Sequence, residues 1–280
     1  MSFLRKDILE RLKATIARGE PIVMGGAGIG LVAKVLDASG IDIIMAYNTG
    51  PFRMDGHGSL AGYLAYGDSN QITLDLAAKI LPVTKNTPVI AGIGAADPYR
   101  DPIALIDVMI GLGFSGITNV PTAGLYDGRF RQHIDATKLG YPEEIRLIGE
   151  CRNKDVFTVA YAFSPEEARA MAGAGADIVG AHVGLTVGGM IGATEALDLD
   201  EACRATSHMF DAAISERPDV LVVAHGGPFD SPASVKRVLE TTQVHGYLGA
   251  SSIERLPVEE SIGKLVAEFR ALGVRGRSGE

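Results

Sequence analysis

Short apolar runs alternate with longer amphipathic segments along almost the whole chain, and this alternation restricts the fold more than any other feature. Apolar runs separated by helix-length segments are typical of parallel strands joined by crossover helices. The chain contains eight such runs. They lie at residues 21–26, 41–46, 88–93, 116–120, 157–162, 177–182, 220–225 and 246–251.

The number of runs decides between two α/β architectures. Doubly wound open sheets usually stop at about five or six strands, whereas a barrel of strand and helix units often occupies about 250 residues as one domain. With 280 residues, 46% of them hydrophobic, the chain can bury a core of that size. We therefore predict a single (β/α)8 TIM-barrel domain over residues 1–280, with residues 274–280 as a flexible tail.

Two amphipathic segments flank the eight runs. The first has leucine or isoleucine at every fourth position from Leu4 to Ile16, which predicts an N-terminal helix. That helix is expected to cover the bottom of the barrel or to join its outer ring. The last segment, from Val258 to Gly273, is predicted to be a helix that buries its apolar side chains. These are Ile262, Leu265, Val266, Phe269 and Leu272.

Charge and cysteine content narrow the function classes. The net charge is −8 and no lysine or arginine cluster stands out, so we expect neither nucleic acid nor a membrane surface as a partner. The N-terminal segment is too charged for a secretion signal, and no apolar run reaches the roughly 20 residues of a membrane span. The two cysteines lack a neighbouring ligand motif. We expect a cytoplasmic protein without disulfides.

The loop from Tyr47 to Gly67, after the second run, is too long for an ordinary connection. Loops above roughly 12–15 residues in a compact domain are usually lids, binding loops or disordered segments. This one combines aromatic rings with Arg53, Asp55 and His57, which disorder would not require. We predict an ordered functional loop, with a structural flap or an oligomer contact as the alternative.

Polar side chains recur where the apolar runs end. Active sites of such barrels lie at the carboxyl ends of the strands, and histidine titrates near neutral pH, so it can serve as general acid or base. We predict that the catalytic residues are His182, His225, Tyr47 and Asn119, with Asn48 orienting the substrate. The alternative for each histidine is a hydrogen-bonded ring that holds a loop.

Glycine and serine at the ends of the last two runs form a candidate anion pocket. Glycines let backbone N–H groups approach an oxyanion, and serine hydroxyls add donors. The corresponding loops bind phosphate in many barrels. We predict a phosphate or carboxylate site here, with ordinary turn chemistry as the alternative. Its predicted residues are Gly226, Gly227, Ser251 and Ser252, together with Arg53 of the long loop.

A second glycine-rich turn follows the first run and includes Gly26 and Gly28. It resembles a dinucleotide-binding fingerprint, but the second run ends in Ala46 and Tyr47 rather than in an acidic residue. We therefore expect no organic cofactor and assign this backbone to the substrate.

Asp97 is the one carboxylate close behind the third run. It is the candidate ligand for Mg²⁺, with water and substrate oxygens completing the coordination. A helix cap before Pro98 is the alternative interpretation.

The chain contains the motifs AGIG, YNTGPFRMDGHGSLAG, AGIGAADP, FSGITNVPTAGLYDGRFR, AYAFSPEEA, GADIVGAHVGL, HGGP and GASSIERLPVE, which span Gly25 to Glu259. Together they resemble the phosphoenolpyruvate hydrolase-like TIM-barrel family, also described as predicted signal-transduction barrels, of the phosphoenolpyruvate mutase/isocitrate lyase superfamily. The resemblance implies a hydrolase or lyase that stabilises the enolate or oxyanion of a small oxo-acid or enol phosphate, generally with magnesium. It also implies a homo-oligomer. Better-known superfamily enzymes carry paired aspartates where this chain has Ala95 and Ala96 before Asp97.

Two other functions remain compatible with these residues. One is a hydrolase or retro-aldol lyase acting on a non-phosphorylated oxo-acid, with a carboxylate in the anion pocket. The other is a barrel without catalysis that serves as a regulatory or interaction module. Polar residues at many strand ends favour an enzyme, because a scaffold alone has no need of them on one rim.

Overall fold

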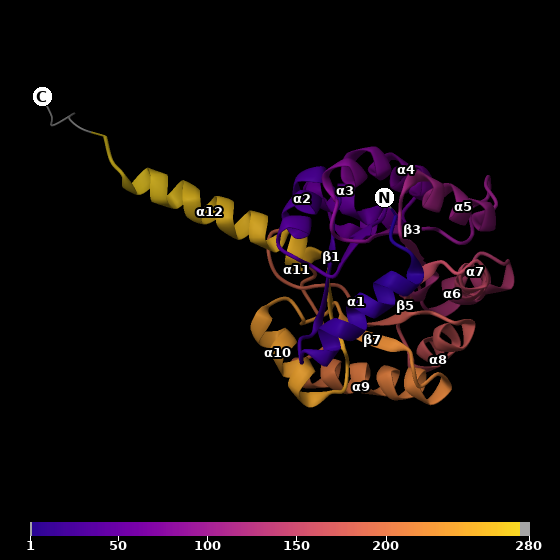
Figure 1. Ribbon diagram of the computed structural model, residues 1–280. Coiled ribbons are helices and arrows are strands. Elements are labelled where there is room, and N and C mark those ends of the chain that lie inside the picture. Colours follow the sequence, from indigo (N-terminus) through magenta and orange to yellow (C-terminus); the bar gives the residue numbers. More distant parts are fainter. Residues whose placement is uncertain (1, 275–280) are drawn as a thin grey trace, which may run out of the picture.

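A computed structural model describes residues 2–274 and shows a closed barrel of eight parallel strands (Figure 1). Consecutive strands pair in chain order, and the last strand pairs with the first, so the predicted (β/α)8 TIM barrel is confirmed. The strands are β1 (Ile22–Gly26), β2 (Ile43–Ala46), β3 (Val89–Gly92), β4 (Gly116–Thr118), β5 (Phe157–Ala162), β6 (Ile178–His182), β7 (Leu221–His225) and β8 (Gly246–Gly249).

Helices surround the strands, as the alternating pattern predicts. Within the described residues, no helix has both the length and the apolar character that a membrane span requires. The main helices are α2 (Gly30–Ala38), α4 (Ser69–Ile80), α5 (Pro102–Leu112), α6 (Gly128–Ala136), α7 (Tyr141–Asn153), α8 (Pro165–Ala174), α9 (Leu199–Glu216) and α10 (Pro232–Thr241). Two short 3-10 helices are η2 (Leu81–Val83) and η3 (Ala123–Leu125).

The N-terminal helix α1 (Arg5–Ala17) takes the first of its two predicted positions, at the bottom of the barrel. Its residues Ile8 and Leu12 are buried in the same apolar cluster as inward side chains of the strands, such as Ile22 and Phe157. Arg5 extends this contact, because its guanidinium pairs with the buried Asp177 at 2.6 Å. The amino-terminal end of the barrel is therefore closed, and a site can form only at the other end.

The long loop after β2 is an ordered segment with two short helices, α3 (Thr49–Met54) and η1 (Ser59–Tyr63). It crosses the glycine-rich turn after β1 in close contact: a Cβ at Gly28 would lie 2.1 Å from the carbonyl carbon of Gly50. Glycine is required there because no side chain fits between the two backbones. The crossing holds α3 over the carboxyl end of the barrel.

The prediction for the final helix was wrong in one respect. Helix α12 (Leu256–Ala271) forms, but Leu256 is its only buried residue, and Phe269 is 63% exposed. Arg255 has helical dihedral angles, so α12 continues outward from the short α11 (Ser251–Glu254) instead of turning back onto the barrel. Figure 1 shows α12 projecting away from the strands. Beyond Val274, the predicted flexible tail lies outside the described residues.

Candidate active site

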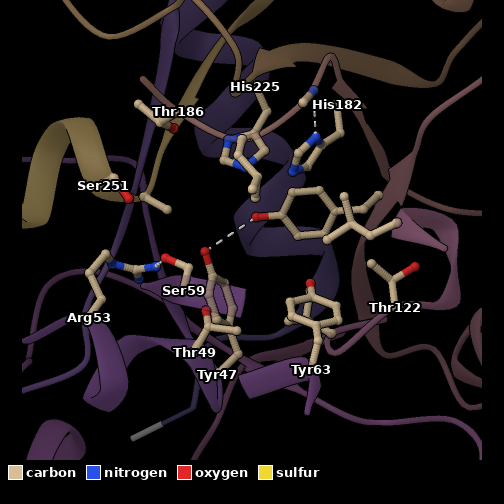
Figure 2. Close-up of a pocket in the computed structure, with 16 residues that line it drawn as sticks. Tyr47, Thr49, Arg53, Ser59, Tyr63, Thr122, His182, Thr186, His225 and Ser251 are labelled. Carbon is tan, nitrogen blue, oxygen red and sulfur yellow. Dashed lines mark hydrogen bonds between the residues drawn. The ribbon is translucent and has the colours of Figure 1, made fainter. Parts of the chain in front are cut away.

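A small cavity lies at the carboxyl ends of the strands, beneath the loop that carries α3 and η1 (Figure 2). Its volume of about 60 Å³ corresponds to roughly four water molecules at about 15 Å³ for each. Such a cavity suits a small substrate. Its lining consists of Tyr47, Thr49, Arg53, Ser59, Tyr63, Val120, Thr122, Leu125, Tyr161, His182, Gly184, Leu185, Thr186, His225, Ala250 and Ser251.

His182 and His225 end the neighbouring strands β6 and β7, which brings their ring centroids to 4.6 Å. The Nδ1 atom of His225 lies 2.7 Å from the carbonyl oxygen of Leu248, which can only accept, so Nδ1 carries the proton. The Nδ1 atom of His182 instead accepts a hydrogen bond from the backbone N–H of Gly184 at 3.1 Å. In its neutral form, His182 therefore carries its proton on Nε2, whereas His225 has a free lone pair there.

Both imidazoles are neutral at pH 7. Burial lowers the pKa of His225 to about 4, although its hydrogen bond to the Leu248 carbonyl opposes the shift. Burial and the neighbouring His225 hold the pKa of His182 well below its ordinary value. The cavity thus offers one ring nitrogen that can accept a proton and one N–H that can donate a hydrogen bond.

Two tyrosines face the histidines. The hydroxyl oxygens of Tyr47 and Tyr161 lie 3.4 Å apart, and the Tyr161 ring contacts both imidazoles. Burial raises the pKa of both phenols, so they stay protonated and act as hydrogen-bond donors. Figure 2 shows Tyr47 across the cavity from the two histidines.

Asn119 does not line the cavity and instead holds Tyr161 in place. Its Oδ1 accepts from the Tyr161 N–H at 2.8 Å, and its Nδ2 donates to the Tyr161 carbonyl at 3.2 Å. The same Nδ2 donates to Glu144 at 2.6 Å. Because all these groups are buried, Asn119 is a positioning residue rather than one that contacts substrate.

Arg53 brings a buried positive charge to the cavity. Its Nε and Nη2 donate to one oxygen of Glu254 at 2.9 and 2.7 Å, and its Nη1 donates to Ser59 at 2.9 Å. Burial alone would lower the pKa of Arg53, but the charge of Glu254 raises it, so the guanidinium stays charged. Figure 2 shows Ser59 and Ser251 on the Arg53 side of the cavity, and the hydroxyls of Thr49 and Thr186 also line it.

Gly26 and Gly28 lie against the ion pair of Arg53 with Glu254 and do not line the cavity. A Cβ at Gly26 would lie 3.3 Å from Nη2 of Arg53, and the Gly28 N–H donates to Glu254. The first glycine-rich turn therefore positions Glu254, and through it Arg53.

The remaining predicted binding residues lie around the cavity without lining it. Gly226 has φ of +79°, and a Cβ there would lie 2.2 Å from the Gly184 carbonyl oxygen, so it and Gly227 allow β7 to pass the loop after β6. The Ser252 hydroxyl bonds to Tyr247, and the Asn48 amide bonds to the Gly62 carbonyl in the long loop.

The residues that line the histidine cavity do not fit a magnesium ion. Asp97 lines a separate cavity of about 690 Å³, and it accepts hydrogen bonds from Asn70, Arg100 and the Tyr99 N–H. The alternative prediction of a helix cap was wrong, because no helix begins at Pro98 and the N-cap of the next helix, α5, is Asp101. No carboxylate lines the histidine cavity. Within residues 2–274, no three histidine, cysteine, aspartate or glutamate side chains converge on a metal site. A magnesium site in a protein usually includes at least one carboxylate side chain as a ligand.

Tyr161 is one of the polar residues that the sequence places at the strand ends, and it lines the cavity from an inward position of β5. Sequence reasoning did not identify several other lining residues. Ser59 and Tyr63 lie on η1, in a loop without periodicity, and no pattern indicates which of its side chains turn inward.

The fold and the site together define an α/β barrel with an enzyme-like cavity at the carboxyl ends of its strands. A comparison with known proteins identifies the family. The phosphoenolpyruvate hydrolase-like family matches residues 7–272, so the chain belongs to this family. The ToMV resistance protein Tm-1(GCR237) of Solanum lycopersicum is 45% identical over 271 residues, which are 96% of this chain. The chain spans 36% of that relative's length.

Crystal structures of two members of the phosphoenolpyruvate mutase/isocitrate lyase superfamily share the fold. Phosphonopyruvate hydrolase in complex with oxalate and Mg²⁺ is 18% identical, with a TM-score of 0.57 over 99% of this chain and 90% of that chain. The superfamily member 2,3-dimethylmalate lyase is also 18% identical, with a TM-score of 0.59 over 100% of this chain and 90% of that chain. At this identity the likeness establishes the fold alone.

Proposed function

We propose that this chain is an enzyme that cleaves a small anionic oxo-acid, or an enol phosphate of similar size, as a hydrolase or lyase. The observation that carries the proposal is the pair of neutral histidines with complementary free ring atoms in one cavity. The family name and the activities of the structural neighbours support the reaction class.

The Arg53 end of the cavity would bind the substrate anion. Its guanidinium charge is fixed by Glu254, and hydroxyls such as those of Ser59 and Ser251 add donors beside it. Because the ion pair is buried, the charge is held in position before substrate arrives. We propose that a carboxylate of the oxo-acid binds at this end.

The histidine end would carry the chemistry. The free Nε2 of His225 accepts a proton from the substrate or from an attacking water, while the Nε2–H of His182 and the Tyr47 hydroxyl donate to the developing enolate or oxyanion. Donors already in place stabilise charge as it forms, without reorganisation. Since the residues that line this cavity do not fit magnesium, no step of the proposed reaction uses the ion.

Hydrogen–deuterium exchange tests this proposal independently of which bond is cleaved. Oxo-acids such as pyruvate and oxaloacetate would be incubated with the protein in D₂O, and loss of the protons beside the carbonyl would be followed by NMR. Phosphate release from phosphoenolpyruvate would be measured in parallel. We expect exchange or cleavage that is insensitive to EDTA and about 100-fold slower in His225→Gln, the lower range for loss of a general base.

His208→Gln is the matched control, because His208 is exposed on α9 and does not line the cavity. It should leave the rate unchanged. Full rates in both His182→Gln and His225→Gln would overturn the assignment of the proton transfers. If the wild type turns over none of the compounds, the proposal that this chain is an enzyme is overturned.

A binding module is the second candidate function, because the tomato relative is named a resistance protein rather than an enzyme. In that case a small anion would raise the unfolding temperature of the protein without being consumed. Binding that depends on Arg53 and remains intact in His225→Gln would support this function over the enzyme.

A further inference from the structure

The larger cavity, of about 690 Å³, lies beside the histidine cavity and is not used by the proposed reaction. Its walls come from the end of the long loop and the start of α4, from the loops after β3 and β4, and from the start of α7. Tyr63 and Thr122 line both cavities, on the side of the histidine cavity away from Arg53 (Figure 2). Small-molecule sites usually have volumes of roughly 300–1,000 Å³, so this cavity has the size of a second ligand site.

Glu144 of α7 contributes a buried acidic group without a counter-charge to the wall of this cavity. The residue is 3% exposed and belongs to no ion pair, whereas the other two buried carboxylates among residues 2–274 are paired. Asp177 pairs with Arg5 at 2.6 Å. Glu254 pairs with Arg53 at 2.7 Å. A buried charge is costly unless an opposite charge lies beside it, so Glu144 lacks a partner that the described chain does not supply.

The Glu144 carboxyl group also has an open acceptor position. Its Oε2 accepts from Asn119 at 2.6 Å and from Thr122 at 2.7 Å, and its Oε1 accepts from the Ala123 N–H at 2.5 Å. A carboxylate has about four acceptor positions, so one on Oε1 remains free. Thr122 and Ala123 themselves line the cavity, which places the carboxyl end of the side chain in its wall. Burial raises the pKa of Glu144 to about 8, and a cation beside it would stabilise the charged form.

The charge of the lining favours a cation over an anion. The charged side chains that line the cavity are Asp68, Asp97 and Glu144, and no lysine or arginine lines it. Arg100 pairs with both aspartates without lining the cavity, so one positive charge offsets two carboxylates. A bare metal ion does not fit, because no three acidic side chains in the described part of the chain are grouped closely enough to hold one.

Aromatic and apolar side chains make up much of the remaining surface. The rings of Tyr63, Tyr99 and Tyr126 line the cavity, and aromatic faces attract cations. Leu64 and Leu139 also line it and are more than half exposed, so apolar surface remains uncovered at the opening. A ligand that suits this lining has a positive charge and an apolar or aromatic body.

We propose that this cavity binds a small organic amine, whose ammonium group pairs with Glu144 while its apolar or aromatic body lies among the tyrosines. The ammonium supplies both the missing counter-charge and a donor for the open position on Oε1. A neutral ligand would supply only the donor, and an anion would supply neither. The proposal does not rest on the proposed reaction, because neither the histidines nor Arg53 takes part in it.

Two probes of the same shape but different charge test the role of the ammonium. Tyramine and its uncharged counterpart 4-ethylphenol would each be titrated into the full chain at neutral pH, with binding followed by NMR of the probe. We expect tyramine to bind at least about 10-fold more tightly, the gain typical of a hydrogen bond to a charged group. Equal affinities, or no binding of tyramine, would overturn the proposal.

Glu144→Gln tests whether the carboxylate is the partner, because it keeps the size of the side chain and removes the charge. Tyramine affinity should fall at least about 10-fold, and that of 4-ethylphenol should not change. Glu143→Gln is the matched control, since Glu143 is the preceding residue of α7, pairs with Arg146 and does not line the cavity. If Glu144→Gln binds tyramine as tightly as the wild type does, the site is wrong.

Leu139→Lys tests the site without a change in the core. Leu139 is exposed at the cavity, so both Leu139→Lys and its uncharged control Leu139→Gln should fold. The added positive charge should weaken tyramine binding at least about 3-fold relative to Leu139→Gln, by repulsion between the two cations. Equal affinities of these two variants for tyramine would contradict binding in this cavity, even if Glu144→Gln does not fold.

Discussion

His182 and His225 illustrate how a single backbone contact assigns a role to a buried side chain. The two rings share one environment, yet one Nδ1 accepts from an N–H and the other faces a carbonyl oxygen. Burial suppresses the charged form of both, and the backbone partner then decides which ring atom faces the cavity without a proton. The division into proton acceptor and hydrogen-bond donor thus needs no third side chain, only two backbone groups.

The depressed pKa of His225 predicts how stability varies with pH. Its pKa in the folded protein is about 4, against 6.5 for an unperturbed histidine, so the unfolded chain binds more protons between these values. The contribution of His225 to the free energy of unfolding is complete above pH 6.5 and is lost as the pH falls towards 4. When the pH is lowered from 6.5 to 5, the free energy of unfolding should decrease in both proteins. The decrease should be about 2 kcal/mol larger in the wild type than in His225→Gln.

Urea denaturation at several pH values would measure this difference. The exposed His208→Gln should keep the wild-type pH dependence. An unchanged slope in His225→Gln would contradict the buried, neutral state of this ring.

At the scale of elements, the cavity is assembled by loops that are tied to distant parts of the chain. The long loop is held by the crossing of Gly28 and Gly50 and by the ion pair of Arg53 with Glu254. The loop after β6 is held at Gly188 by the first turn of α12. Since both loops line the cavity, its shape depends on contacts far from the strands that carry the histidines.

Gly28→Ala tests whether the crossing positions the long loop. The new Cβ would lie 2.1 Å from the Gly50 backbone, so α3 must move away and take Arg53 with it. We expect faster proteolysis within residues 47–67 and weakened binding of small anions, with a stability loss of about 1–3 kcal/mol from overpacking.

Gly58→Ala is the matched control in the same loop, because no atom lies within 4 Å of a Cβ there and its φ is −60°. It should behave as wild type. Equal protease sensitivity in the two variants would show that the crossing does not hold the loop.

Over the whole molecule, the two ends of the barrel have separate tasks. The amino-terminal end is closed by α1, whose apolar side chains complete the inner core, and the carboxyl end holds the cavity. Changes at the closed end should therefore alter stability without altering ligand affinity.

Leu12→Ala tests this separation. Leu12 is fully buried in α1, so the substitution should cost about 2–5 kcal/mol by leaving a cavity in the inner core. Leu4→Ala is the control, since Leu4 is 59% exposed and should change stability little. Anion affinity, measured by calorimetry at a temperature where both variants are folded, should equal that of wild type.

The sequence by itself determined the barrel and its rim. Runs of apolar residues and amphipathic helices are local patterns, so eight strands, the order of elements and the N-terminal helix could be predicted. Because strand ends share one edge, His182, His225, Tyr47 and Ser251 could also be singled out, and the structure brings all four to one cavity.

Only the tertiary structure decided what each side chain meets. Arg53 and Glu254 are 201 residues apart, and Asn119 turns to Tyr161 rather than to the cavity. The apolar residues of α12 predict a covered face but do not say what covers it, and the structure directs that helix away from its own barrel. Periodicity reports which side of an element is apolar; pairing between distant segments depends on how the whole chain closes.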